Sequence, residues 1–224
     1  MRSITKATIG IVTAGLLAFG LGACSSNTSS SDTSAGSTSS AAATPKPIAS
    51  IPSLSGVDTQ VAVDKGFLDA LTSLGLTPGV VGTATLTDGV LAFPITGGNV
   101  DYYDPNESYR PYVQGSIEHE GSGLSLSAGG TTVELTNFTI DPGTSELYGD
   151  VAANGSPVVS QALLFDLDGS TLKPLQTAGD TAILEGTTVH VSADAADLLN
   201  KTFGTTAVKE GLLVGVAKIT VNTK

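Results

Sequence analysis

Tyrosines and one histidine form the densest group of chemically useful side chains in this sequence. Four of the five tyrosines fall in one short stretch of a chain that has no tryptophan: Tyr102, Tyr103, Tyr109 and Tyr112. A phenol ring offers rigid contact area and a hydroxyl, which suits a flat ring system, a glycan or a partner protein. The same rings could instead brace a long loop against a sheet, so the stretch supports both a binding and a structural interpretation.

His119 lies between two glutamates, a few residues after the tyrosines. It is a candidate ligand or hydrogen-bond partner in a pocket shared with Tyr109 and Tyr112. The alternative is a histidine at the end of a strand, paired with a flanking carboxylate. The other histidine, His190, alternates within a strand near Asp194 and is interpreted as structural. Because the two histidines share no metal-ligand spacing, no zinc site is predicted.

Sequence signatures of enzymes are mostly absent from the chain. It has no Gly-x-Ser-x-Gly elbow, no His-Glu-x-x-His, no P-loop and no dinucleotide-binding glycine pattern. A hydrolase site built from His119, a carboxylate and a serine remains an alternative that spacing does not exclude. Carboxylates at 101–107 and 166–168 could bind calcium, but neither group has the spacing of an EF-hand loop. We therefore predict neither a catalytic site nor a metal site.

The only cysteine, Cys24, ends a segment that has the order of a secretion leader. Arg2 and Lys6 come first, and an apolar run at 9–21 follows that is too short for a stable transmembrane helix. The small residues that end at Ala23 resemble the cleavage site of a bacterial lipoprotein. We predict cleavage between Ala23 and Cys24, with palmitate-like acyl chains on Cys24 holding the protein on the extracytoplasmic face of the cell membrane. An idle thiol beside an ordinary secretory cleavage site is the alternative.

Composition divides the rest of the chain into two parts. Residues 24–49 are mostly Ser, Thr, Ala and Gly, which bury too little apolar surface to become ordered, so we predict a disordered tether after the leader at 1–23. Residues 50–224 contain no cysteine and alternate apolar and polar residues in short runs between glycine-rich turns. This pattern predicts one mainly β domain without disulfides, either a sandwich or a partly closed barrel of short strands with two short helices.

Two segments predict a strand that runs directly into a helix. Helices are expected at 64–74 and 192–203, each after a Val-x-Val run. Asp64 and Ser192 stand where N-capping side chains belong, and glycines stand where both helices stop. The two segments could form an internal repeat, or they could share only their capping chemistry.

The charge of the chain excludes one class of partner. It has 10 basic and 21 acidic residues and a net charge of −11, and removal of Arg2 and Lys6 with the leader makes the balance more negative. Nucleic-acid binding requires clustered Lys and Arg to neutralise phosphates, so we predict no nucleic-acid partner. The acidic surface is expected to keep the domain soluble and monomeric.

Three segments resemble known proteins: residues 93–98, 115–126 and 133–138. They are similar to a widespread group of secreted bacterial β domains without an assigned activity and, more distantly, to the HtaA-type haem-binding domains of Gram-positive surface proteins. Those domains bind haem through a tyrosine assisted by a histidine. The resemblance implies Tyr109 or Tyr112 as the haem ligand and His119 as the assisting residue. In that family the tyrosine lies near the domain start and follows a tryptophan, whereas here it lies inside the β run.

The sequence therefore predicts a membrane-anchored, extracytoplasmic lipoprotein whose non-catalytic β domain binds an envelope component or a partner protein. Two alternatives stay open. One is a carrier of haem or of another small ligand that uses Tyr109, Tyr112 and His119. The other is a hydrolase with a site built around His119.

Overall fold

The computed structural model of the protein describes residues 45–224. In this part of the chain, no helix is long and apolar enough to cross a membrane. The predictions for the leader, for Ala23 and Cys24, and for most of the tether lie outside the described residues. The elements, in chain order, are β1 (Ala49–Ile51), β2 (Val57–Val63), α1 (Lys65–Ser73), β3 (Thr77–Gly82), β4 (Thr85–Thr87), β5 (Val90–Pro94), β6 (Gly97–Tyr102), β7 (Val113–Ala128), β8 (Thr131–Asp141), β9 (Glu146–Ala153), β10 (Ser156–Asp168), β11 (Gln176–Ala178), β12 (Thr181–Val191), α2 (Ala193–Phe203) and β13 (Leu213–Asn222).

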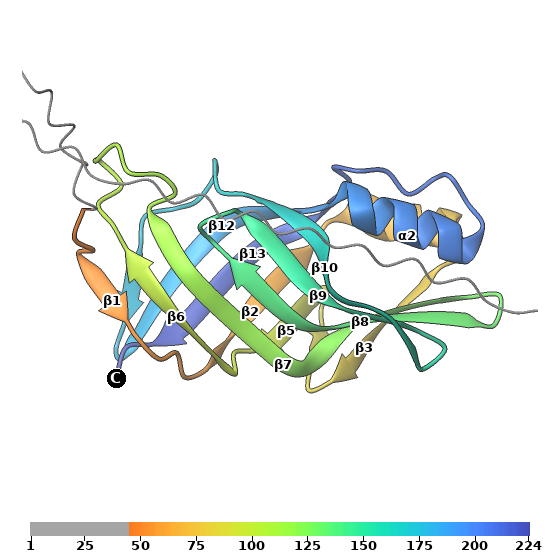
Figure 1. The fold of residues 1–224 in the computed structure, drawn as a ribbon, viewed down its shortest axis with the longest axis horizontal. Helices are drawn as coiled ribbons and strands as arrows, with labels where there is room; N and C mark the ends of the chain where they lie inside the picture. Colours follow the sequence, from red (N-terminus) through yellow and green to blue (C-terminus); the bar gives the residue numbers. More distant parts are fainter. Residues whose placement is uncertain (1–44) are drawn as a thin grey trace, which may run out of the picture. The chain divides into compact units, whose positions relative to one another are not determined.

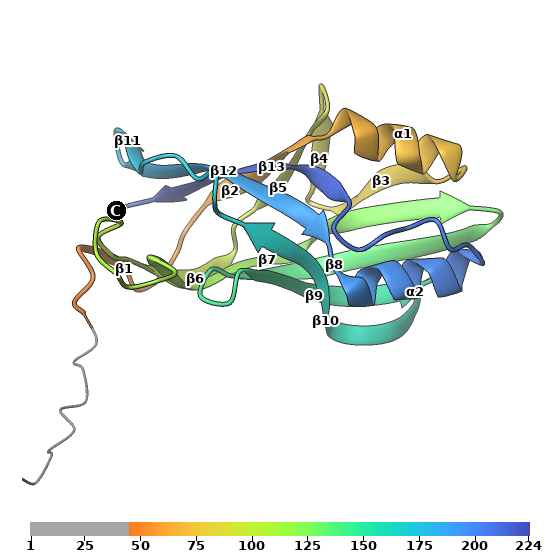
Figure 2. The same ribbon diagram turned by 90° about the horizontal axis from the view of Figure 1, so that it is seen from above.

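The strands belong to one antiparallel sheet that curls around a concave face (Figure 1). The strand order is β1-β6-β7-β8-β9-β10-β12-β13-β2-β5-β4, with β11 paired to β12 and β3 paired to β7. The mainly β fold with two short helices is confirmed, and of the two expected architectures the partly closed barrel is the one found. Both helices lie at one end of the sheet, and β1, β11 and the C-terminus lie at the other (Figures 1 and 2).

A line of β-bulges bends the long strands and adds to the curl of the sheet. The register of β7 against β8 shifts between His119 and Gly123, and β8 shifts against β9 at its Thr136–Thr139 segment. Gly121 and Asn137 have left-handed backbones there, with φ of 73° and 54°. A bulge bends its strand and increases the local twist. As a result, β7 pairs with β6 before the bend and with β3 after it.

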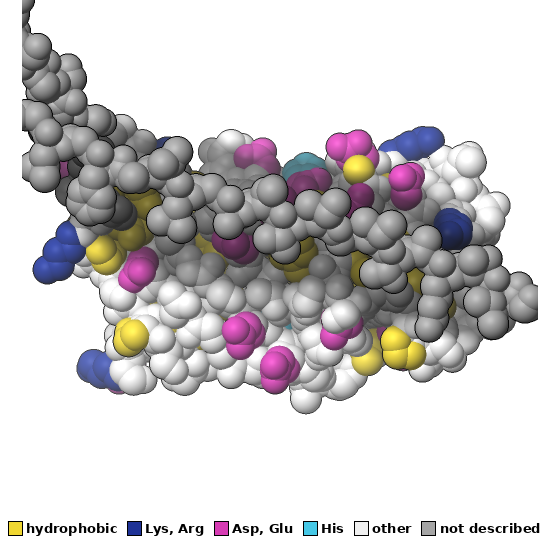
Figure 3. Space-filling view, viewed as in Figure 1, with side chains coloured by type: hydrophobic (Ala, Val, Ile, Leu, Met, Phe, Trp, Pro, Cys, Tyr) yellow, Lys and Arg dark blue, Asp and Glu magenta, His cyan; other side chains and the backbone are white. Residues whose placement is uncertain are grey.

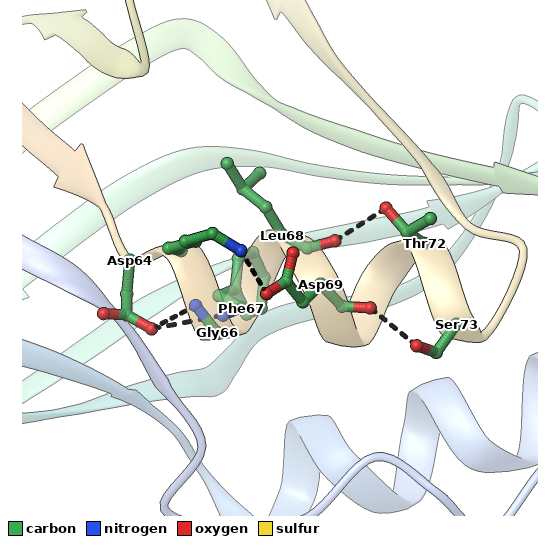
Figure 4. A network of polar contacts seen from close by, with 8 residues as sticks. Asp64, Gly66, Phe67, Leu68, Asp69, Thr72 and Ser73 are labelled. Atoms are coloured by element: carbon green, nitrogen blue, oxygen red, sulfur yellow. Dashed lines mark hydrogen bonds and ion pairs between the residues drawn. The ribbon is translucent and has the colours of Figure 1, made fainter.

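The two predicted strand-then-helix units are confirmed. β2 leads into α1 and β12 leads into α2, and both strands pair with β13, one on each side. The Asp64 carboxylate accepts hydrogen bonds from the N–H groups of Gly66 at 2.7 Å and Phe67 at 3.2 Å (Figure 4). The Ser192 hydroxyl accepts one from the N–H of Ala195 at 3.0 Å. The two residues that predicted the helix starts therefore cap them.

Aromatic and aliphatic side chains fill much of the inner face of the sheet. The Phe138 ring packs edge-on against Phe93, with centroids 5.3 Å apart, and against Phe165, with centroids 6.5 Å apart. Val133 and Leu164 beside them are 0% and 1% exposed. Acidic side chains are instead spread over the surface seen in Figure 3. The inner face is not filled along its whole length, and one unfilled region lies toward β1 and β11.

Candidate ligand-binding cavity

A cavity of about 570 Å³ lies in the concave face, at the end of the sheet opposite the helices. We name it the sheet cavity. Its walls come from β1, β6, β7, β8, β10, β11, β12 and β13 and from the loops before β7 and β11. Most of the lining is aliphatic, and it includes Ile51, Val100, Val113, Ile117, Ile140, Leu167, Leu172, Leu175, Ala182, Leu184, Ile219 and Val221. Its shape and composition are those of a site for a small apolar molecule.

The aromatic loop, residues 103–112 between β6 and β7, contributes one wall of the sheet cavity. Tyr102 packs edge-on against Tyr112, with ring centroids 5.7 Å apart, and both line the cavity. Tyr103 packs on Tyr109, with centroids 4.6 Å apart, and this pair lies outside the lining. The bracing interpretation therefore describes Tyr103 and Tyr109, whereas Tyr102 and Tyr112 are placed to contact a ligand.

Arg110 is held in place by its own loop. Its Nη1 donates to the carbonyls of Glu107 at 2.5 Å and Tyr109 at 2.8 Å, and its Nη2 donates to the carbonyl of Pro105 at 2.6 Å. The guanidinium carbon also lies 5.5 Å from the centre of the Tyr112 ring, in a cation–π arrangement. These contacts fix a positive charge on the wall of the sheet cavity.

The Tyr102 hydroxyl remains protonated at neutral pH. Burial raises the pKa of this phenol above its ordinary value, and the neighbouring Tyr112 phenol acts in the same direction. A hydrogen bond with the Leu175 backbone opposes the shift. A neutral hydroxyl can donate and accept hydrogen bonds, so Tyr102 offers an orienting group without adding negative charge.

His119 lies in the packed core and outside the lining of the sheet cavity. Its side chain is 1% exposed and lines a separate void of about 50 Å³ among Phe93, Phe138 and Phe165. Nδ1 lies 3.2 Å from the Phe138 carbonyl, and Nε2 lies 2.8 Å from the Thr59 hydroxyl. Because a carbonyl only accepts, we assign the hydrogen to Nδ1, and Thr59 then donates to Nε2. Burial lowers the pKa of His119 to about 4.

The structure therefore separates the three residues expected to share a tyrosine–histidine pocket. Only Tyr112 reaches the sheet cavity, because Tyr109 packs on Tyr103 and His119 points into the core. The hydrogen-bond partners of the His119 ring do not include the expected flanking carboxylate. The Ser122 hydroxyl donates to the His119 carbonyl at 3.1 Å and does not bond the ring. The described residues thus do not assemble the serine, histidine and carboxylate that the hydrolase alternative requires around His119.

The remaining predicted groups are engaged locally. His190 lies 2.9 Å from the Thr188 hydroxyl and 3.1 Å from the Gly211 carbonyl, so its ring is held by local polar groups. The Asp104 carboxylate accepts from the backbone N–H of Asn106 at 2.9 Å, as in an ordinary turn. Within residues 45–224, no three His, Cys, Asp or Glu side chains are grouped so that they could hold a metal ion.

Most of the cavity lining was missed by reasoning from the sequence. Arg110 stands beside the predicted tyrosine ligands, but its type and spacing do not indicate a cavity wall. Ala182 and Leu184 lie two apart on β12, and this period predicts that they share one face of the sheet. The same period would be seen whether that face was packed or hollow. Leu172 and Leu175 come from a loop without a regular pattern.

Neither the models of protein families nor the curated proteins compared with this sequence match it. Among solved structures, the C-terminal domain of HtaA from Corynebacterium glutamicum matches with a TM-score of 0.52 and 14% identity, over 77% of this chain and 98% of that one. The chain has the fold of this HtaA domain. The N-terminal domain of HtaA matches with a TM-score of 0.48 and 12% identity, over 76% and 99% of the two chains. The heme binding protein HtaB of the same organism matches with a TM-score of 0.44 and 11% identity, over 78% and 96%.

The distant similarity expected from the sequence motifs is thus confirmed for the fold. We refer to this architecture as the HtaA-like fold. At this level of identity the similarity describes how the chain is folded, and the chemistry of the sheet cavity has to be argued from the residues of this chain.

Proposed function

We propose that this domain binds a small, largely apolar ligand in the sheet cavity and has no catalytic role there. The observation that carries the proposal is the cavity of about 570 Å³ in the concave face. Ligand sites in soluble proteins are mostly apolar, have volumes of about 300–1,000 Å³ and hold a few polar groups that orient the ligand. Tyr102, Arg110 and Tyr112 provide such groups on one wall.

Haem is a second candidate for the ligand. It is favoured by the resemblance to HtaA-type haem-binding domains and by one residue of this cavity, Tyr112. The Arg110 guanidinium carbon lies 5.5 Å from the centre of the Tyr112 ring, so a positive charge is held beside the candidate ligand. When bound, haem would supply an iron that a side-chain oxygen could ligate, and Tyr112 is the side chain that would hold it. His119 lies in the core and does not reach that position.

The anchoring predicted from the leader belongs to the same proposal. A lipid on Cys24 would hold the domain at the extracytoplasmic face of the membrane as a tethered binding module. β1, the first strand, forms part of the cavity wall, so the chain enters the domain beside the proposed site. An envelope component or a partner protein bound through the outer surface of the aromatic loop remains the alternative partner.

The proposal is tested by a fluorescence titration of the purified chain with phenylnaphthylamine, a neutral apolar probe. Saturable enhancement is expected for the wild type. The Ala182→Phe variant should lose it, because the new ring would occupy space at the β12 wall of the cavity. Val159→Phe is the matched control, since Val159 lies on β10 and is 42% exposed. A flat titration of the wild type, or equal binding by both variants, would contradict the proposal.

Haemin tests the second candidate through its Soret absorbance. If Tyr112 holds the iron, Tyr112→Phe abolishes a saturable Soret shift while keeping the ring that packs on Tyr102. Tyr109→Phe removes the same hydroxyl from a ring outside the cavity lining and should keep the shift. No shift in the wild type would remove haem from consideration, and a shift that Tyr112→Phe retains would show that Tyr112 is not the ligand.

A further inference from the structure

We propose that the ligand of the sheet cavity is an anionic amphiphile, an apolar chain with a carboxylate or phosphate head, and that Arg110 binds the head. This inference rests on the proposed function, because it assigns a ligand class to the same cavity. It is drawn from the distribution of charge on the cavity wall, from the way Arg110 is held and from the mostly apolar character of the rest of the lining.

The cavity wall has the opposite charge to the rest of the chain. The protein has 21 acidic residues and a net charge of −11, yet among the described residues that line the cavity there is no Asp or Glu. The one ionic side chain in the lining is Arg110. The acidic surface repels an anion in general, whereas Arg110 attracts one at this position. The cavity lining therefore favours a ligand that carries a negative charge as well as an apolar body.

Arg110 is fixed in position and has no ion-pair partner within residues 45–224. The three ion pairs of this region join Lys65 to Asp69, Lys173 to Glu185 and Lys224 to Asp180. The contacts of Arg110 with its own loop are all to neutral backbone carbonyls, made through Nη1 and Nη2. A guanidinium has five N–H donors, so donors remain for a carboxylate or phosphate oxygen. Because the loop already holds the side chain, little further conformational entropy is lost when an anion binds.

Most of the rest of the lining offers apolar contacts to the body of the ligand. Ile117 and Ile140 form part of it and are 3% and 4% exposed, and Leu167, Leu184 and Ile219 continue the same surface. A ligand with a charge at one end and a hydrocarbon chain at the other would match both the Arg110 guanidinium and these aliphatic side chains. Each methylene that the aliphatic wall buries adds about 0.8 kcal/mol to binding.

The experiment measures displacement of phenylnaphthylamine from the purified chain by dodecanoate, dodecyl phosphate and dodecanol. The three share one alkyl chain and differ in the head, so the two anions also separate a carboxylate ligand from a phosphate ligand.

We expect one or both anions to bind at least about tenfold more tightly than the alcohol, as for a charge-assisted hydrogen bond. Arg110→Gln should remove this preference without changing the affinity for dodecanol, and Arg110→Lys should keep part of it. Lys209→Gln, the same charge change beyond α2, is the control and should leave the preference intact.

The outcomes separate this inference from the function on which it rests. If the probe does not bind the wild type, the proposed function itself is wrong. If the probe binds but all three compounds displace it equally, the cavity binds ligands and the assignment of an anionic head is wrong. If Arg110→Gln weakens dodecanol as much as the anions, Arg110 only supports the aromatic loop, and the inference is again wrong.

Discussion

The side chain of His119 is bonded only to neutral groups, the Thr59 hydroxyl and the Phe138 carbonyl. An imidazolium there would be buried without a counter-charge, which is why burial lowers the pKa of His119 from 6.5 to about 4. Between these two values the unfolded chain binds a proton that the folded chain does not. The free energy of unfolding therefore falls as the pH drops through this window, by at most about 3 kcal/mol from this residue.

Replacing His119 should change this pH dependence. We predict that His119→Gln lowers the free energy of unfolding at neutral pH by about 1–3 kcal/mol, because buried hydrogen bonds are disturbed. Between pH 6.5 and 4 the variant should lose less stability than the wild type, since its side chain does not titrate. Urea unfolding at several pH values measures both effects. His190→Gln, a change of the second histidine, which is half-buried on β12, serves as the control. A wild-type slope in His119→Gln would show that another group causes the acid destabilisation.

At the scale of elements, the two capped helices differ in where their caps lie. The Ser192 hydroxyl is buried, accepts from the Ala195 N–H at 3.0 Å and donates to the Leu163 carbonyl at 2.8 Å. The Asp64 carboxylate is only half-buried, and its hydrogen bond to the Gly66 N–H is exposed. Ser192→Ala removes the partner of a buried N–H and of a part-buried carbonyl, and we predict a loss of about 2–3 kcal/mol in the free energy of unfolding. Asp64→Ala should cost about 1 kcal/mol, because water can replace the carboxylate.

Denaturant unfolding of the two alanine variants measures these losses directly. A larger cost for Ser192→Ala would show that the α2 cap also ties the helix to β10, through the Leu163 carbonyl. Equal losses in the free energy of unfolding would contradict this and would show that the two caps contribute in the same way. The comparison therefore also tests whether the N-caps of the two strand-then-helix units contribute equally to the free energy of unfolding.

Local chemistry explains which elements were predictable. The capping side chains of α1 and α2 act on residues two or three positions away, so their effect is visible in the sequence. β3 was not predicted, since Pro78 and Gly79 weaken a strand pattern and the strand forms only where β7 bends and offers an edge. The length of β7 was also missed, because the bulge after His119 depends on the partner strand.

At the scale of the whole molecule, the predicted tyrosine–histidine pocket is not found, because the boundary between the sheet cavity and the packed core runs between its residues. Ile117 and His119 lie on one face of β7, two residues and therefore about 7 Å apart. Ile117 lines the sheet cavity, whereas His119 already lies among the core phenylalanines. Spacing in the sequence predicted a pocket shared by His119 and Tyr112, but the boundary between core and cavity is set by strands from distant parts of the chain. Sequence motifs therefore predicted the HtaA-like fold, but they did not predict the sheet cavity within it.

That boundary leads to a prediction for the stability of the whole domain. A protein that keeps a cavity of about 570 Å³ forgoes packing contacts that a filled core would make, in exchange for a binding site. Ala182→Phe should therefore match or exceed the wild type in the free energy of unfolding without ligand, by about 0.5–2 kcal/mol if the ring packs without strain. Dodecanoate at about 100 times its dissociation constant should stabilise the wild type by about 2.7 kcal/mol and leave Ala182→Phe unchanged. Val159→Phe should keep the full ligand effect. A destabilised Ala182→Phe that still gains stability from the ligand would show that side chain and ligand do not compete for the same space, and the ligand would then have to bind elsewhere on the fold.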